Sequence, residues 1–224
     1  MNTIEQNKLF LEKEADEWFN RNKSRLNQLA ESPSSDLILT TISQLNLTPS
    51  SVLEIGACNG WRLNAINELY NADVTGIEPS LAAIEDGKKH FSKVNLIRGT
   101  ADELPFDADS FDLVILGFCL YLCDPSDLFK IASKVDRVLE DNGWLIILDF
   151  IPPRPYRNSY IHLKGLYSYK MDYSQLFSGH PAYQLMTRII QANNKVIEPD
   201  DVVGINALYK NTKIAFPDNP YPDI

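Results

Sequence analysis

Short apolar runs alternate with amphipathic stretches over the middle of the chain, and the two kinds of segment predict different elements. Runs of branched apolar residues predict buried parallel strands. Stretches with apolar residues three and four positions apart predict helices that pack through one face. The predicted strands are 52–55, 74–78, 94–97, 111–118 and 144–150, and the predicted helices are 36–47, 61–70, 80–91 and 127–139, the last ending near Gly143. This alternation predicts an α/β domain with a doubly wound, mostly parallel sheet.

Three segments depart from this alternation. Residues 1–31 are charged and carry an apolar stripe that predicts helix. Residues 151–180 are rich in proline and tyrosine, which suits either a cover over a substrate or a packed surface loop. Residues 182–192 and 201–210 alternate well enough to predict a pair of antiparallel strands. We therefore divide a single domain, residues 1–224, into an N-terminal helical lid or cap (1–47), a core (48–150), a substrate-covering insertion (151–180) and a terminal strand pair (181–215).

A glycine turn follows the first predicted strand. Glu54 and Gly56 end that strand, and Gly60 directly precedes a predicted helix. A strand, a turn and a helix start bring free backbone N–H groups and the positive end of a helix to one place. The dinucleotide fingerprint would need glycine where Cys58 and Trp61 stand, and the G-K-[ST] sequence of a phosphate-binding loop is absent. The turn therefore predicts a ligand cradle that matches neither of these loops.

Glu78 ends the second predicted strand, 22 positions after Gly56. A carboxylate at the tip of the neighbouring strand can accept hydrogen bonds from both hydroxyl groups of a ribose. The alternative is an ordinary strand-end glutamate that faces solvent. Together with the glycine turn, this spacing favours a ligand that carries a ribose.

The sequence resembles the class I S-adenosylmethionine (AdoMet)-dependent methyltransferases in five segments, which occur in the order and with the gaps of that family. They are VLEIGACNG (52–60), VTGIEPS (74–80), GTADELPF (99–106), FDLVILGF (111–118) and RVLEDNGWLIILDF (137–150). Two positions depart from the family pattern, since Cys58 stands at its usual middle glycine and Asn142-Gly143 at its usual Gly-Gly. The resemblance implies a seven-stranded, mostly parallel sheet in the order 3-2-1-4-5-7-6, with the last strand antiparallel and helices on both faces.

The resemblance also implies a cofactor site in the core. Glu78 would hold the ribose and Asp102 the adenine amino group, because a carboxylate accepts from such a group. Asp102 can alternatively belong to a polar loop or a helix start. The backbone from Gly56 to Gly60 would hold the methionine end, with Glu54 orienting that turn or the amino group. The expected cofactor-binding residues are Trp18, Arg21, Glu54, Gly56, Ala57, Cys58, Gly60, Glu78, Pro79, Ala101, Asp102, Gly117 and Phe118.

Trp18 and Arg21 are in this set because similar enzymes often carry N-terminal helices over the cofactor. The two residues are three positions apart, so that they can face the site together. The alternative is a helix that packs on the edge of the sheet.

Three residues are the main candidates for the acceptor chemistry. His162 is the first candidate for a general base, because the unperturbed pKa of histidine lies near operating pH. The alternative for His162 is a structural role in an aromatic loop. Tyr121 lies where related enzymes often place an aromatic residue or histidine near the transferred methyl, and Asp149 lies near the end of the fifth predicted strand. Asp172 is a further candidate base.

Charge and cysteine content limit the partners. The formal net charge of −9 argues against general binding to nucleic acids or anionic membranes. The three cysteines form no C-x-x-C pair and lack a histidine cluster, so we expect reduced thiols and no metal site. No signal-peptide pattern is visible, and the longest apolar run, 113–122, is about half a membrane span. We expect a cytoplasmic protein without membrane insertion, whose oligomeric state stays open.

The sequence therefore predicts an AdoMet-dependent methyltransferase that releases S-adenosylhomocysteine. The expected acceptor is a small or medium molecule with an oxygen nucleophile, such as a sugar or glycan hydroxyl. Residues 162–173 are also similar to methyltransferases encoded with bacterial surface-glycan pathways. The alternatives are a catalytically silent AdoMet-binding partner or regulatory protein, a methyltransferase acting on protein or RNA, and an aminopropyl-transferring enzyme of the same fold.

Overall fold

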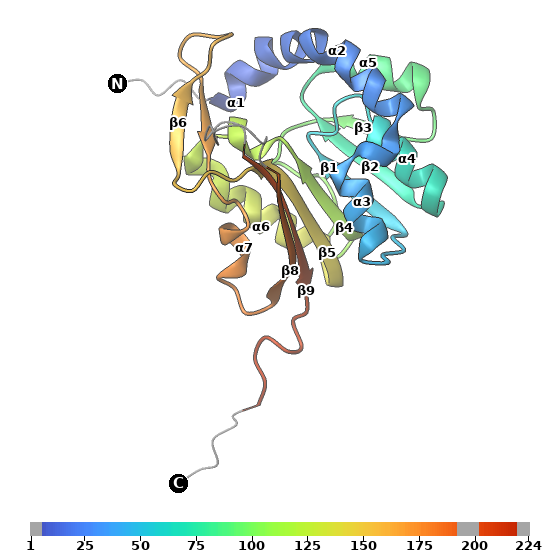
Figure 1. Ribbon diagram of the computed structural model, residues 1–224, viewed down its shortest axis with the longest axis vertical. Coiled ribbons are helices and arrows are strands. Elements are labelled where there is room, and N and C mark those ends of the chain that lie inside the picture. Colours follow the sequence, from blue (N-terminus) through green and yellow to red (C-terminus); the bar gives the residue numbers. More distant parts are fainter. Residues whose placement is uncertain (1–5, 192–201, 219–224) are drawn as a thin grey trace.

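The computed structural model describes residues 6–191 and 202–218, and its centre is a seven-stranded sheet (Figure 1). The strand order across the sheet is β3-β2-β1-β4-β5-β9-β8. Neighbours are parallel from β3 to β5, whereas β9 runs antiparallel to both β5 and β8. Numbered within this sheet alone, the order is 3-2-1-4-5-7-6 with the last strand antiparallel, which confirms the predicted fold. The strands are β1 Ser51–Ile55, β2 Asp73–Glu78, β3 Asn95–Arg98, β4 Phe111–Gly117, β5 Leu139–Phe150, β8 Tyr183–Gln191 and β9 Val203–Lys210.

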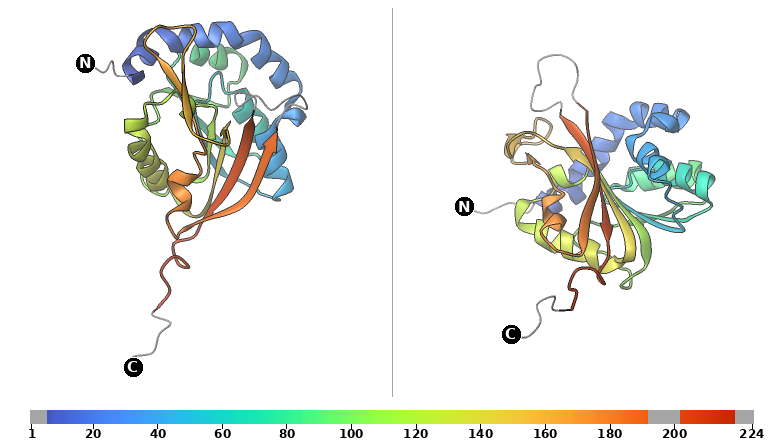
Figure 2. Two further views of the ribbon diagram at one scale, coloured as in Figure 1. Left: turned by 60° about the vertical axis from the view of Figure 1, so that its left-hand side comes forward. Right: turned by 60° about the horizontal axis from the view of Figure 1, so that its bottom comes forward.

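Helices cover both faces of the sheet (Figures 1 and 2). One apolar cluster joins the sheet to the face with α3, α4 and α5 and includes the buried Ile42 and Leu63. A second cluster joins the other face to α6 and α7 and includes the buried Ile131 and Phe177. Because both faces are covered, β4 is apolar on both of its sides. The helices are α1 Gln6–Leu9, α2 Ala15–Glu31, α3 Leu37–Gln44, α4 Trp61–Tyr70, α5 Leu81–His90, α6 Leu128–Val138 and α7 Gln175–Ser178.

Side-chain caps fix where two helices begin. Asp36 Oδ1 accepts from the backbone N–H groups of Ile38 and Leu39 at 3.0 Å each, at the start of α3. The hydroxyl of Ser80 accepts from the N–H of Ala83 at 3.0 Å, at the start of α5. Both helices lie within the ranges that the sequence predicts for them.

The end of α6 differs from the prediction. The helix stops at Val138, because Leu139 already has extended dihedrals (φ −80°, ψ 123°) and pairs with Phe111 of β4. The register of β4 and β5 then shifts, so that Trp144 pairs with Leu113. The strand expected to begin at Trp144 therefore begins at Leu139, with an irregularity before Trp144 in which Asn142 adopts a left-handed φ of 67°.

Residues 151–180 contain a separate two-stranded hairpin, β6 Tyr156–Ser159 and β7 Tyr167–Lys170, followed by α7. The hairpin stands at the same end of the molecule as α1 and the start of α2 (Figures 1 and 2). Parts of the two predicted terminal strands, at Ala192 and Asp201, lie outside the described residues. Within the described residues, none of the helices combines the length and the apolar character that crossing a membrane requires.

Candidate functional site

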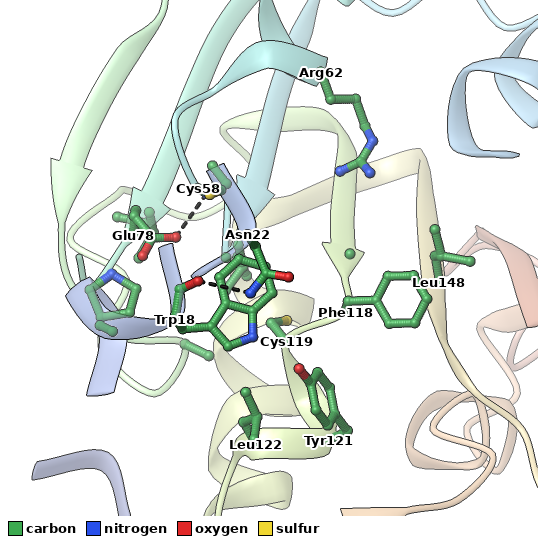
Figure 3. Close-up of a pocket in the computed structure, with 18 of the residues that line it drawn as sticks. Trp18, Asn22, Cys58, Arg62, Glu78, Phe118, Cys119, Tyr121, Leu122 and Leu148 are labelled. Carbon is green, nitrogen blue, oxygen red and sulfur yellow. Dashed lines mark hydrogen bonds between the residues drawn. The ribbon is translucent and has the colours of Figure 1, made fainter. Parts of the chain in front are cut away.

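A cavity of about 750 Å³ lies at the carboxyl ends of the parallel strands, under one face of α2 (Figure 3). Its walls come from the ends of β1, β2, β4 and β5 and from α2. β1 and β4 are neighbours in the middle of the sheet, and the helices that follow them, α4 and α6, pack on opposite faces. Open α/β sheets bind ligands at such a reversal. The cavity therefore occupies the position that this topology favours for a ligand.

The turn after β1 has a backbone that few residues adopt. Gly56 has a φ of +75°, and a Cβ atom there would lie 2.7 Å from Cβ of Cys119, so both conformation and space require glycine. Cys58 also has a left-handed φ, 53°, although it carries a side chain. Burial raises the pKa of the Cys58 thiol well above its ordinary value, so the thiol stays neutral. Gly56, Ala57 and Cys58 all line the cavity.

Gly60 does not reach the cavity, in contrast to its neighbours in the turn. It precedes α4 with a φ of +78°, and a Cβ there would lie 2.9 Å from Cγ1 of Val94. Its role is to let the chain enter α4 close to the core.

Glu78 lies at the end of β2 and lines the cavity with a buried side chain. Its Oε2 accepts from the N–H of Cys58 and its Oε1 from the N–H of Ser80, each at 2.8 Å. Burial raises the pKa of Glu78 to about 7, although these bonds favour the charged form. The carboxyl group thus holds the turn after β1 in place and keeps further lone pairs for a ligand.

Arg62, at the start of α4, joins two buried carboxylates at another side of the cavity. Its Nη2 lies 3.0 Å from Oδ2 of Asp36, and its Nη1 contacts Oε1 of Glu54. Burial raises the pKa of Glu54, which Arg62 partly opposes. Oε2 of Glu54 is buried and has no hydrogen-bond partner among the described residues. Gly117 lets this group approach β4, since a Cβ there would lie 3.0 Å from Nη1 of Arg62.

Sequence reasoning missed Arg62 and the second role of Asp36. Asp36 was expected only at a helix start, yet it also binds a guanidinium 26 positions away. Nothing in the local pattern marks this pair, because it joins the starts of two different helices. Glu54 was expected to orient the glycine turn or an amino group, and its carboxylate does not itself line the cavity.

Asp102 lines the cavity beyond Glu78, together with Ala101 and Pro79. Its Oδ2 accepts from Nζ of Lys130 at 2.8 Å. Burial acts to raise the pKa of Asp102, but the bond to Lys130 and others outweigh it, and the pKa lies below its ordinary value. Asp102 is therefore charged and able to accept a hydrogen bond.

The helix α2 covers the cavity, and Trp18 points into it (Figure 3). The Nδ2 group of Asn22 donates to the carbonyl oxygen of Trp18 at 2.8 Å. Arg21 does not line the cavity, which differs from the expectation that it faces the site with Trp18. Its guanidinium instead pairs with the buried Glu14 and lies 3.3 Å from the hydroxyl of Tyr160. The buried carboxylate draws the arginine away from the cavity.

Several polar side chains hold the N-terminal helices against the rest of the molecule, and the sequence did not predict these contacts. Gln6 is buried, and its Nε2 donates to the carbonyl oxygens of Leu122 at 2.6 Å and Tyr167 at 2.9 Å. The hydroxyl of Tyr160 donates to Glu14 at 2.8 Å, which ties the hairpin to the helical segment. These contacts make one structure of α1, α2 and the β6–β7 hairpin, which we call the cover.

A third fastening lies on the other side of the cavity. Oδ1 of Asp16 accepts from the hydroxyl of Ser80 at 2.6 Å and from the N–H of Ala82 at 3.0 Å. These two bonds of Asp16 join α2 to the start of α5, which follows Glu78 closely in the chain.

The structure brings Tyr121 to the cavity and places Asp149 behind it. Tyr121 lines the cavity, and its N–H donates to Oδ2 of Asp149 at 3.2 Å. Oδ1 of Asp149 accepts from the N–H of Phe150 at 2.8 Å. Burial raises the pKa of Asp149 to about 7. Asp149 is not among the residues that line the cavity, so it positions the backbone around Tyr121 instead of reaching a ligand directly.

His162 and Asp172 lie elsewhere, which differs from their expected place at the acceptor. His162 is exposed on the loop of the β6–β7 hairpin, where its ring packs edge-on against Tyr160 at 5.3 Å. Asp172 pairs with Arg188 at 2.6 Å. Neither lines the cavity. Among the described residues, no group of three or more His, Cys, Asp or Glu is arranged to hold a metal ion.

The family model described as "Methyltransferase domain" matches residues 53–147, the part of the chain that builds the strand side of the cavity. These residues of the chain therefore carry a methyltransferase domain, and the fold around them is that of a class I methyltransferase. An uncharacterised methyltransferase of Synechocystis sp. is 28% identical over 50% of this chain and 53% of its own length. Demethylmenaquinone methyltransferase of Thermotoga maritima is 27% identical over 71% of this chain and 69% of its own length. The chain thus spans about half the length of the Synechocystis relative.

A solved structure supports the fold of this methyltransferase over most of its length. The 1,6-didemethyltoxoflavin-N1-methyltransferase of Burkholderia thailandensis, determined with its acceptor and S-adenosylhomocysteine, has a TM-score of 0.72. The two chains are 13% identical, and the match covers 94% of this chain and 91% of the other. At this identity the likeness shows the fold alone.

Proposed function

We propose that this protein transfers the methyl group of AdoMet to an acceptor bound in the same cavity under α2. The observation that carries the proposal is Glu78, a buried carboxyl group at the end of β2 that is held by two backbone N–H groups beside the glycine turn. The family's cofactor is AdoMet, and its ribose needs an acceptor for two hydroxyl groups at this place.

The residues present fit this cofactor. Gly56 lets the turn pack against Cys119, where φ and space allow no side chain, and Gly56, Ala57 and Cys58 line the cavity beside Glu78. Glu54 does not line the cavity, so it would act on the methionine end through Arg62 and the turn that it helps to position. Asp102 is a charged acceptor at the side where an adenine amino group would lie. Together these groups would hold the methionine, ribose and adenine parts.

When bound, AdoMet supplies a methyl group that its sulfonium already activates. The contribution of this chain is to bind, orient and exclude water. Orientation of two reactants can lower a barrier by roughly 7–11 kcal/mol. The cover places Trp18 over the cavity from one side, while Phe118 and Tyr121 line it from the ends of the sheet (Figure 3).

The acceptor that we propose is a small or medium molecule, because the cavity is bounded by the cover and the sheet and takes a ligand of limited size. An oxygen nucleophile is part of this proposal, and a sugar or glycan hydroxyl is the class that the sequence favours. The hairpin that the sequence assigns to substrate covering is fastened to α2 through Tyr160, which supports its place in the cover.

Calorimetric titration with AdoMet and with S-adenosylhomocysteine tests the proposal. The wild-type protein is expected to bind both with micromolar affinity. Glu78→Gln should weaken binding by at least about tenfold, because hydrogen bonds to a charged acceptor contribute about 1.5–3 kcal/mol each. Glu85→Gln is the matched control, since Glu85 is exposed on α5 and lies outside the cavity lining.

The outcomes separate the alternatives. Binding that is equal in wild type and Glu78→Gln would overturn the assignment of Glu78 to the ribose. Binding of both nucleosides without release of S-adenosylhomocysteine on any acceptor would instead favour a catalytically silent AdoMet-binding protein.

A further inference from the structure

Four aromatic side chains meet in one part of the cavity. Trp18 comes from α2, Phe118 from the end of β4, Tyr121 from the turn that follows, and Phe150 from the end of β5. The ring centroids of Phe118 and Tyr121 lie 5.6 Å and 5.2 Å from that of Phe150, and both pairs are edge-on. In Figure 3, Phe118 and Tyr121 lie on the side of Trp18 away from Glu78. Trp18 and Phe118 were expected at the cofactor, but this placement away from Glu78 makes the group of rings available to the acceptor.

The ring of Phe118 is attached to a backbone that has an unfavourable conformation. Its φ is 53°, which is unusual for a bulky residue. Its N–H donates to the carbonyl oxygen of Leu148 at 2.7 Å, and this bond holds the backbone in that conformation. Such strain gathers at ligand clamps and active sites, where the surrounding structure maintains it. Glycine or asparagine would fit the same backbone with less strain, so the position retains the ring itself.

Tyr121 offers a hydrogen-bond donor beside these rings. Tyr121 lines the cavity, and its phenolic hydroxyl can donate one hydrogen bond as well as accept. The hydroxyl therefore has a hydrogen that it can donate to a ligand in the cavity. Burial and the nearby Asp149 raise the pKa of Tyr121, so the hydroxyl keeps this hydrogen at neutral pH.

The rings are held by groups outside the cavity. The Nζ atom of Lys170, in β7, lies 4.0 Å from the ring centroid of Phe150 without lining the cavity, and this cation–π contact orients the ring. Asp149 accepts from the N–H groups of both Tyr121 and Phe150. A binding surface that is ordered before the ligand arrives loses less entropy on binding.

We propose that Trp18, Phe118, Tyr121 and Phe150 bind a planar aromatic ring of the acceptor, and that the Tyr121 hydroxyl donates to a nitrogen or oxygen atom of that ring system. The inference rests on the methyl transfer of the proposed function, but it replaces the sugar acceptor that the sequence favours with a planar ring in the same cavity. Flat rings gain most from aromatic walls, whereas a sugar presents hydroxyl groups around a puckered ring and needs more polar partners. The remaining wall includes the apolar Leu148 and Val203.

Binding of two nearly isosteric probes tests the inference. Quinoline and naphthalene are both flat, but only quinoline has a ring nitrogen that accepts a hydrogen bond. Each is titrated into the full chain saturated with S-adenosylhomocysteine, and methyl β-D-glucopyranoside serves as the sugar probe. We expect quinoline to bind best and the glucoside worst. Phe118→Asn should weaken both flat probes by about tenfold, because it removes a ring contact and suits the left-handed backbone.

Two further variants sharpen the test. Tyr121→Phe keeps the ring and removes the donor, so quinoline should bind as weakly as naphthalene while naphthalene is unaffected. Phe129→Leu is the control, because Phe129 is 79% exposed on α6, outside the cavity. Circular dichroism and urea unfolding show that each variant is folded, and each variant is titrated at a concentration of S-adenosylhomocysteine that saturates it.

The inference is overturned if neither flat probe binds saturably, if the glucoside binds more tightly than both, or if Phe118→Asn and Tyr121→Phe change nothing. Failure of the proposed function gives a different result. The wild-type protein would then not bind S-adenosylhomocysteine. Binding of the flat probes is in that case measured on the protein without S-adenosylhomocysteine.

Discussion

The two sides of the cavity are built by different kinds of contact. On the strand side, the groups that shape the site are close in the chain, since the Cys58–Glu78 bond spans 20 positions and the Arg62–Glu54 pair 8. On the cover side, Gln6 reaches Leu122 over 116 positions and Tyr160 reaches Glu14 over 146. The strand side is continuous with the core of the sheet, whereas a few polar side chains fasten the cover. The strand side should therefore open only when the domain unfolds, while the cover can open by itself.

Arg62→Met should produce the largest effect and tests the strand side. It leaves the carboxylates of Asp36 and Glu54 buried without their cation, which costs about 3–5 kcal/mol. Urea unfolding measures the loss of global stability. Arg154→Met, at an exposed position, is the control and should change the free energy of unfolding by less than about 0.5 kcal/mol. A similarly small loss for Arg62→Met would contradict the view that this side depends on its buried charges.

Two buried carboxyl groups on the strand side have a pKa raised to about 7, Glu78 at the end of β2 and Asp149 near the end of β5. An unfolded aspartate titrates near 3.9, so the folded state binds the extra proton between that value and about 7. The stabilisation is complete below about pH 4 and is lost as the pH rises through 7, by at most about 1.4 kcal/mol per unit.

Asp149→Asn removes this dependence. Between pH 5 and pH 7, wild type should lose roughly 2 kcal/mol of unfolding free energy relative to the variant. Urea unfolding at the two pH values measures the difference, and Glu78→Gln should change the slope in the same direction. Parallel profiles for wild type and Asp149→Asn would show that the pKa of Asp149 is not raised.

Tyr160→Phe should produce the smallest effect and one confined to the cover. It removes the bonds that the Tyr160 hydroxyl makes to Glu14 and Arg21, worth about 1–2 kcal/mol together for a half-buried group. Hydrogen exchange of the amides of α2 should become about tenfold faster, with little change in global unfolding. Tyr209→Phe is the matched control, because it also removes one hydrogen bond of a tyrosine hydroxyl, at 2.9 Å to Asn142. That bond lies at the ends of β9 and β5 that are away from the cavity. Equal acceleration in both variants would mean that the cover is not a separate unit.

The same contrast explains what the sequence could predict. The strands and helices follow from periodicity, because burial on one face or on both faces leaves a repeating pattern within a few residues. The glycine turn and Glu78 follow from spacing within one strand–helix–strand unit. The early end of α6 does not, because the strand pairing of Leu139 with Phe111 outweighs the local helical pattern.

The cover was only partly predictable for the same reason. Trp18 was expected at the site from the resemblance, and the structure places it in the cavity. The place of Arg21 depends on Glu14 and Tyr160, and the latter lies 139 positions away. His162 stood out by its residue type, yet the hairpin carries it to an exposed loop. Chemistry suggested by residue type alone was therefore less reliable than chemistry suggested by position in a repeating unit.

The left-handed backbone at Phe118 has a consequence for how this protein and its relatives diverge. Random mutation to glycine at this position would relieve backbone strain of about 1–3 kcal/mol, so stability alone gives selection little reason to keep a ring there. We expect lineages that change or lose the acceptor to drift toward glycine or asparagine at this position while the turn at Gly56 stays the same. Across an evolutionary tree, substitutions at position 118 would then mark the lineages in which the acceptor changed while the cofactor stayed the same.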